Sequence, residues 1–282
     1  MFRTRLLSGV LLVIIALATI MAGDGILAVI LCLVSLIAYR ELIRACGVHT
    51  EGNAPEAVGM VMTVLYYGLL FMTLYVGGEQ ADVLAKVYPV IVIAVVLTMI
   101  VFLFTYVFTF PRYKAQQIMA SMFSWLYGPV MLSFIYLTRE GFAHGKYLVW
   151  FVFLCSWGSD TCAYAVGVLF GKHKMTPKLS PKKSVEGAVG GIVGAALLFV
   201  LYTHFAVNRY SQASLSLLLV AALGAAGAVV SMIGDLAASA IKRDHDIKDY
   251  GKLIPGHGGI MDRFDSVIIA APLVFIGLML IA

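Results

Sequence analysis

The chain has 282 residues, of which 61% are hydrophobic and only 12% charged, with a formal net charge of +5. Soluble domains are usually about 45–50% apolar and about 25% charged, so this composition excludes an ordinary soluble domain. It predicts an all-α fold, a polytopic helical bundle in a membrane. In such a protein the distribution of basic residues matters more than their sum, so the positive charge is not read as a sign of nucleic-acid binding.

Windows of about 20 apolar residues predict about nine transmembrane helices. The first follows Arg3 and Arg5, and its length, with eight further spans behind it, favours an uncleaved helix over a signal peptide. The predicted spans are residues 6–22, 25–43, 56–77, 84–108, 118–138, 147–170, 187–207, 214–241 and 266–281.

Basic residues orient these spans, because lysine and arginine concentrate in cytoplasmic loops. Sixteen of the 20 lysines and arginines fall on the side of the amino terminus, and only Lys86, Arg139, Lys146 and Arg209 fall on the other. The sequence therefore predicts a cytoplasmic amino terminus. The richest cytoplasmic loops follow the sixth and eighth spans.

The two halves of the chain differ in character. Residues 1–146 are apolar spans with short connections, and we predict that they form a scaffold that contacts lipid and a second subunit. Residues 147–282 carry carboxylates within spans and long basic loops rich in glycine and proline, so we predict that this half is catalytic.

Two aspartates lie inside predicted spans, where a charge costs roughly 2.5–3.5 kcal/mol at the bilayer centre. Asp160 shares a helical stripe with Ser156 and Tyr164, and Asp235 shares one with Ser231, Ser239 and Lys242. One interpretation is a purely structural polar clamp between helices. Because both stripes open on the predicted cytoplasmic side, a polar cavity is the favoured interpretation.

The segment 239–265 is the most informative part of the chain. Its glycine-rich stretch between Pro255 and Gly259 lets backbone N–H groups approach phosphate oxygens closely. Asp262 and Asp265 are three residues apart at the predicted start of the last span, and with Asp235 they form an oxygen-rich cluster suited to Mg²⁺. Arg263 either meets a phosphate or balances the two carboxylates beside it.

A second basic loop lies between the spans that carry the two aspartates. Its lysines, Lys182 and Lys183 among them, are consistent either with anchoring to anionic lipid headgroups or with handling of phosphate. The glycines just after it superficially match a dinucleotide-binding pattern, but no strand precedes them. Close helix packing at small-residue spacing is favoured for Gly187, Gly190, Gly191 and Gly194.

The motifs together resemble a known family. The pattern Ser-x-Ile-Lys-Arg, four residues, Lys-Asp-x-Gly, two residues, Ile-Pro-x-His-Gly-Gly-Ile-x-Asp-Arg-Phe-Asp over 239–265 is similar to the signature of phosphatidate cytidylyltransferases, the CDP-diacylglycerol synthases. The resemblance continues through Ser159-Asp160-Thr161, Ser180-Pro181-Lys182-Lys183-Ser184, Glu186-Gly187 and Gly234-Asp235. Cys162 and the pair Ser184-Val185 are small departures that remove no charged group.

The resemblance implies a Mg²⁺-dependent transfer of CMP from CTP to phosphatidic acid, giving CDP-diacylglycerol and pyrophosphate, with a second cation left open. It implies a homodimer in the cell (inner) membrane, in contact with membrane lipids, whose active site faces the cytoplasm. The catalytic residues expected are Asp235, Asp262, Asp265, Lys242, Arg263 and His257, the three aspartates being the metal ligands. The substrate-binding residues expected are Asp160, Lys182, Lys183, Ser184, Glu186, Ser239, Arg243, Lys248, Asp249, Gly258 and Gly259.

Two other classes of membrane protein agree less well with the sequence. An ion-coupled transporter would use the intramembrane Asp and Ser stripes to bind an ion, but the charges converge on one face and the halves show no matching pair of broken helices. A CDP-alcohol phosphotransferase would carry an Asp-Gly-x-x-Ala-Arg sequence, which this chain lacks. The cytidylyltransferase remains the leading hypothesis.

Overall fold

The computed structural model describes residues 2–48, 52–76, 83–211, 214–256 and 258–281. Within these residues eight helices are long and apolar enough to cross a membrane, and a shorter apolar stretch, Gly9–Ala22, lies in α1. Each of the nine predicted spans coincides with a helix or helical run to within five residues at either end. The all-α, polytopic membrane architecture is therefore confirmed, whereas the cytoplasmic amino terminus stays a prediction.

The chain folds into two compact units, described separately below. The first comprises Met1–Tyr136, Glu140–Ala143 and Ile247–Arg263, and the second comprises Leu137–Arg139, His144–Asp246 and Phe264–Ala282. The segment 247–263, which the sequence places in the catalytic half, thus packs with the amino-terminal helices. Helix α13 (Met261–Ile281) begins in the first unit and continues in the second.

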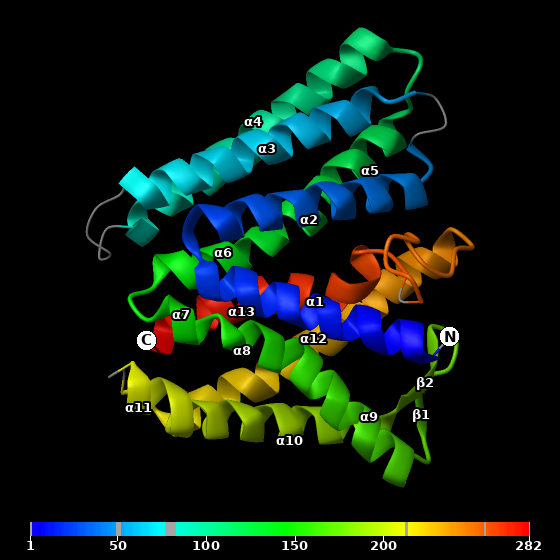
Figure 1. Cartoon of the computed structure of the whole chain (residues 1–282). Coiled ribbons are helices and arrows are strands. Elements are labelled where there is room, and N and C mark those ends of the chain that lie inside the picture. Colours follow the sequence, from blue (N-terminus) through cyan, green and yellow to red (C-terminus); the bar gives the residue numbers. More distant parts are fainter. Residues whose placement is uncertain (1, 49–51, 77–82, 212–213, 257, 282) are drawn as a thin grey trace. The chain divides into compact units, whose positions relative to one another are not determined.

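Long helices dominate the first unit, and α3 and α4 lie side by side in it (Figure 1). Its elements are α1 (Phe2–Ala22), α2 (Asp24–Ala45), α3 (Ala54–Val76), α4 (Val83–Thr109), α5 (Ala115–Trp125), the π-helix η3 (Leu126–Val130) and most of α6 (Met131–Gly141). Two pairs of buried hydroxyls hydrogen-bond between the helices: those of Tyr66 and Ser133 are 2.8 Å apart, and so are those of Ser35 and Tyr67.

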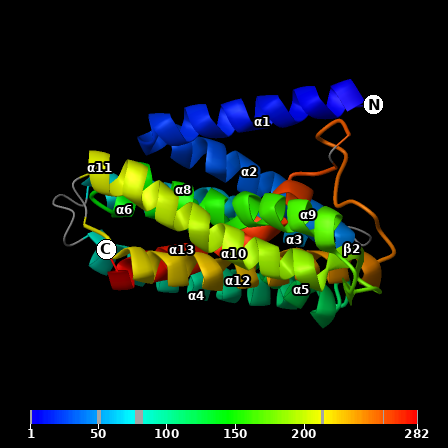
Figure 2. The same cartoon turned by 90° about the horizontal axis from the view of Figure 1, so that it is seen from below.

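The second unit is built around α10, which packs against both α9 and α12 (Figures 1 and 2). Its elements are α7 (Gly145–Leu148), α8 (Trp150–Phe153), the π-helix η4 (Leu154–Gly158), α9 (Ser159–Phe170), β1 (Lys174–Thr176), β2 (Ser180–Ser184), α10 (Val185–Tyr202), the π-helix η5 (Thr203–Val207), α11 (Asn208–Tyr210), α12 (Leu217–Asp244) and most of α13.

Small residues bring α9 and α10 into close contact. A Cβ added at Gly190 would collide with Val166, and one at Gly194 would collide with Cys162. At Gly191 the added atom would be 3.0 Å from the Cβ of Ala163. The close approach of the two helices at these glycines agrees with the role in helix packing that the sequence predicts.

One sequence expectation about secondary structure is wrong. The sequence predicts no strand before the glycines that begin at Gly187, yet β1 and β2 lie directly before them and form an antiparallel hairpin with Lys174 opposite Ser184 and Thr176 opposite Ser180. The strands are short, three and five residues, and rich in lysine and serine, so hydrophobic alternation could not reveal them. The hairpin makes the basic loop between α9 and α10 an ordered element.

Candidate functional site

A pocket of about 490 Å³ in the second unit gathers five of the predicted site residues. They come from three places in the chain, namely α9, the β2 strand with its end, and α12. The five are Asp160, Lys182, Lys183, Ser184 and Asp235. A cavity beside the basic loop is therefore present, and it carries side chains of both signs of charge, although most of its surface is apolar.

The centre of this pocket is an ion pair between the Lys183 ammonium and the Asp235 carboxylate. The two side chains are only 24% and 25% exposed, so the charges neutralise each other where water is scarce. Asp160, on the same pocket wall, accepts a hydrogen bond of 3.4 Å from the Ser266 hydroxyl. The two aspartates of the predicted spans thus lie in the same pocket as lysines of the basic loop.

Asp265 lies in the same unit, on the first turns of α13, and is partly buried. Its Oδ1 accepts the backbone N–H of Ser266 at 2.9 Å. Since Ser266 also donates its hydroxyl to Asp160, this short stretch of α13 links two of the predicted carboxylates.

The predicted stripe of Ser156, Asp160 and Tyr164 is not uniform. Ser156 is fully buried, whereas Tyr164 is 75% exposed and lines the pocket together with Asp160. The reason is that Ser156 lies in the π-helical turn η4, which widens the helix and shifts the register just before Asp160. The stripe on α12 lies within one uninterrupted α-helix.

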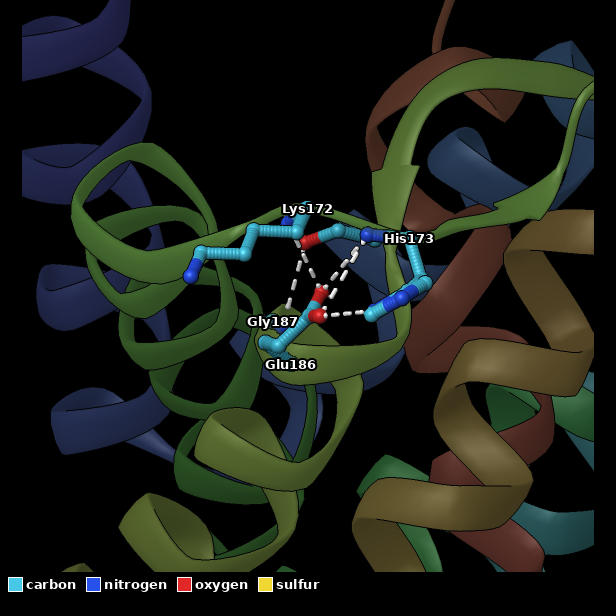
Figure 3. Close-up of polar contacts among 5 residues, drawn as sticks. Lys172, His173, Glu186 and Gly187 are labelled. Carbon is cyan, nitrogen blue, oxygen red and sulfur yellow. Dashed lines mark hydrogen bonds and ion pairs between the residues drawn. The ribbon is translucent and has the colours of Figure 1, made fainter.

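Glu186 contacts the backbone and the histidine of the basic loop (Figure 3), and it is not among the residues that line the pocket. Its carboxylate accepts the backbone N–H of Lys172 at 3.1 Å and that of His173 at 3.2 Å. It also lies 2.6 Å from Nδ1 of the His173 ring. The role of Glu186 in substrate binding stays a prediction. What the structure shows is its hydrogen bonds to Lys172 and His173 of the loop.

Ser184 joins the hairpin to α10 as the N-cap of that helix. Its hydroxyl oxygen accepts the backbone N–H of Gly187 at 3.1 Å, which satisfies one of the free donors at the helix start. The same residue lines the pocket. The cap therefore fixes where the basic loop ends and α10 begins.

We expect Ser184→Ala to lower the free energy of unfolding by about 1 kcal/mol, the usual loss for a serine N-cap. Denaturant unfolding of the detergent-solubilised protein measures it. Ser216→Ala is the matched control, because Ser216 occupies the N-cap position of α12 without a side-chain cap bond. Equal losses in the two variants would show that the hydrogen bond to Gly187 is not the cause.

A second pocket, of about 580 Å³, lies in the first unit and is predominantly polar. Four predicted residues line it: Lys248, Asp249, Gly258 and Arg263. The backbone around it is tightly folded, with positive φ at Gly256 (79°) and Gly258 (88°) and a hydrogen bond of 2.8 Å from Ile254 N–H to the Gly258 carbonyl. Only glycine adopts such angles readily, which explains the glycine-rich sequence here.

Asp262 is buried beside this pocket, with 8% of its surface exposed. Its Oδ2 accepts two backbone N–H groups, from Tyr250 at 2.8 Å and from Gly259 at 3.0 Å. The Gly259 N–H is thus engaged inside the protein, and the expectation that it meets a phosphate stays a prediction. Asp262 holds the loop as well as offering a carboxylate.

The remaining predicted residues lie at the end of α12 or outside the described chain. Ser239 and Lys242 are partly exposed and Arg243 is exposed, all on the last turns of that helix. His257 lies outside the described residues, so its predicted catalytic role stays a prediction.

Several residues of these sites escaped the sequence reasoning. Lys174 lines the first pocket, and Lys252 lines the second. Glu41, a buried carboxylate near the end of α2, binds the backbone of residues 260 and 261. An acidic side chain at the end of an apolar span is itself a signal, by the rule that singled out Asp160 and Asp235.

The residues of the second-unit pocket fit a magnesium ion by their chemistry. Among the described residues no group of three or more His, Cys, Asp or Glu side chains is arranged to hold a metal. Mg²⁺ does not need such a cage, since it binds one or two carboxylates and completes its shell with water and substrate phosphates. Asp160 and Asp235 supply two carboxylates in one pocket, beside lysines suited to phosphate.

Comparison with known proteins places the chain in a family. The model of the cytidylyltransferase family matches residues 3–281. A phosphatidate cytidylyltransferase of Staphylococcus epidermidis is 31% identical over 272 residues, 96% of each chain, and one of Staphylococcus aureus is 29% identical over 276 residues, again 96% of each. One of Haemophilus influenzae is 35% identical over 130 residues, 46% of this chain and 44% of that protein. The chain therefore belongs to the cytidylyltransferase family.

Proposed function

We propose that this protein is a phosphatidate cytidylyltransferase, which transfers CMP from CTP to phosphatidic acid and releases pyrophosphate. Family membership over nearly the whole chain supports the transferase class, and the full-length relatives bear that name. The observation that carries the proposal to the site is the pocket that joins the Lys183–Asp235 ion pair to Asp160 and Lys182.

The reaction is a displacement at phosphorus. A phosphate oxygen of phosphatidic acid attacks the α-phosphorus of CTP, the new P–O bond forms, and the bond to pyrophosphate breaks. The attacking oxygen is already anionic, so the reaction needs no strong general base, and the protein contributes positioning and neutralisation of charge.

The side chains can be assigned to these tasks. Lys182 and Lys183 would neutralise phosphate oxygens at the second-unit pocket, and Lys248 and Arg263 would do so at the first-unit pocket. The acyl chains can remain in lipid while only the headgroup enters, because most of the protein is built from spanning helices.

Asp160, Asp235 and Asp265, all in the second unit, are the proposed ligands or neighbours of Mg²⁺. Asp262, in the first unit, is proposed as a ligand from the family resemblance alone. When bound, the metal supplies positive charge to the phosphate oxygens during the transfer. Lys183, paired with Asp235 in this structure, has a phosphate as its natural alternative partner.

The alternative of an ion-coupled transporter is not favoured. The transporter hypothesis rests on the two aspartates within predicted spans. The chain that carries them belongs to the cytidylyltransferase family. The basic hairpin beside Asp160 and Asp235 is suited to an anionic substrate rather than to a coupling cation.

The cellular setting is part of the proposal. We place the protein in the inner membrane of a bacterial cell, with the basic hairpin and segment 239–265 in the cytoplasm. The asymmetric distribution of lysine and arginine supports this orientation. A homodimer, proposed from the resemblance, is to be checked by the mass of the purified particle.

The direct test is pyrophosphate release by the purified, detergent-solubilised protein supplied with CTP, phosphatidic acid and Mg²⁺. We expect release only when both substrates are present, and its loss when EDTA removes the metal, with recovery on excess Mg²⁺. Absence of release from well-folded protein would reject the proposed function. Release that survives EDTA would keep the function and reject the metal.

A further inference from the structure

Glu41 connects two parts of the first unit that are far apart in sequence. It lies near the end of α2 (Asp24–Ala45), and its two carboxylate oxygens accept the backbone N–H groups of Ile260 and Met261 at 3.1 and 2.8 Å. The side chain is only 8% exposed. It is thus a buried anion bound to the first residues of α13, some 220 positions further along the chain.

The place that Glu41 occupies is one where helices commonly bind anions. The first N–H groups of a helix have no partner within the helix, and the helix dipole favours negative charge there. In this protein the N–H of Gly259 goes to Asp262, and those of Ile260 and Met261 go to Glu41. The carboxylate of Glu41 therefore binds the N–H groups at the start of α13.

The glycines around Glu41 are explained by its position. A Cβ added at Gly251 would collide with the Glu41 carboxylate, and one added at Gly259 would collide with both of its oxygens. Both glycines have no side chain because the carboxylate occupies that space. Glu41 and the glycine-rich backbone are therefore fitted to each other.

Glu41 also adjoins the pocket of about 580 Å³ in the first unit, because Gly251 lines that pocket and its added Cβ would meet the carboxylate. Three cationic side chains, Lys248, Lys252 and Arg263, line the same pocket. Since Glu41 and Asp262 already use the N–H groups of residues 259–261, anion binding here depends on these cations and on how the backbone places them.

We infer that Glu41 is a positioning residue for the nucleotide: it fixes the backbone at Gly251 and at Gly259–Met261, so that Lys248, Lys252 and Arg263 meet the triphosphate of CTP. This inference rests on the proposed function. It assigns to an amino-terminal helix, α2, a role in nucleotide binding.

The test compares Glu41→Gln with Glu56→Gln in the full-length protein. Glutamine keeps the shape but offers one acceptor oxygen, so an NH₂ group faces a backbone N–H donor. Glu56 is a matched control, because it is also 8% exposed in the same unit but pairs with Arg40, at 2.7 Å.

We expect Glu41→Gln to raise the KM for CTP about tenfold or more, as loss of a charge-assisted hydrogen bond does, and to leave the KM for phosphatidic acid within about twofold. Glu56→Gln should change neither KM. Equal changes for both substrates, or no change, would overturn the inference, since a purely structural role does not distinguish the substrates.

Hydrogen exchange separates this inference from the proposed function. Amide hydrogen exchange in a peptide covering residues 258–264 should become faster in Glu41→Gln and stay unchanged in Glu56→Gln, whether or not the protein transfers cytidylyl groups. Unchanged exchange would reject the positioning role even in an active enzyme. If Glu41→Gln fails to fold, Gly259→Ala perturbs the same contact from the other side and should give the same selective rise in KM for CTP.

Discussion

Asp235→Asn is expected to reduce kcat/KM about a thousandfold, a loss of about 4 kcal/mol in transition-state stabilisation. The substitution removes a carboxylate from the pocket in the second unit and leaves Lys183 without its ion-pair partner. Asp160 is then the only carboxylate that lines this pocket among the described residues, so the positive charge of Lys183 is less well balanced and binding and catalysis should both suffer. Steady-state assays with saturating lipid give the value.

The control for this variant is Asp244→Asn, at the last residue of the same helix, where the side chain is exposed. It should retain full activity. Retention of more than a tenth of the activity in Asp235→Asn would move the chemistry away from this pocket.

A double-mutant cycle can show that the two charges act as a unit. If Lys183 and Asp235 serve one step, Lys183→Met should be nearly as damaging alone as together with Asp235→Asn. Additive losses would mean that the ion pair seen in the structure has no part in a shared function.

Asp262→Asn has the second largest expected effect, a loss of about a hundredfold or more in kcat/KM. Asparagine can keep an oxygen toward the N–H groups of Tyr250 and Gly259, so the loop contacts survive in weakened form while the charge is lost. If Asp262 is a metal ligand, the Mg²⁺ concentration that gives half-maximal activity should also rise. An unchanged magnesium dependence would assign Asp262 to the loop alone.

The matched control is Asp246→Asn. Asp246 is exposed and has a positive φ of 52°, a conformation that asparagine adopts as readily as aspartate. This variant makes the same change from aspartate to asparagine within the same segment, 239–265. It should behave as the unmodified protein, and loss of activity in it would show that net charge near the segment, rather than Asp262, is responsible.

Much of the architecture could be predicted from the sequence, because a membrane imposes simple demands on a chain. Each span must be long and apolar, and its backbone must be satisfied internally, so hydropathy alone located the eight long apolar helices of the described residues and the shorter apolar stretch in α1. The same logic made Asp160 and Asp235 conspicuous, since a carboxylate inside an apolar helix needs a functional or structural reason. The structure placed both in one pocket.

Local geometry was harder to predict from the sequence. The β1–β2 hairpin is polar and short, so it carries no hydrophobic period, and the π-turn before Asp160 follows from packing rather than from any residue pattern. Ser184 and Glu186 were expected at the substrate, and the structure shows contacts that a motif does not specify: one caps α10, the other ties down Lys172 and His173.

The sequence by itself determined the class of protein and the family resemblance, and it predicted the spans and the residue types of the candidate site, because all of these depend on composition and local spacing. Only the tertiary structure decided which charges pair and which backbone groups are already engaged. Lys183 and Asp235 are 52 positions apart, and Glu41 is about 220 positions from the N–H groups it accepts. Contacts at such separations depend on how the helices pack, and no local pattern in the chain encodes that packing.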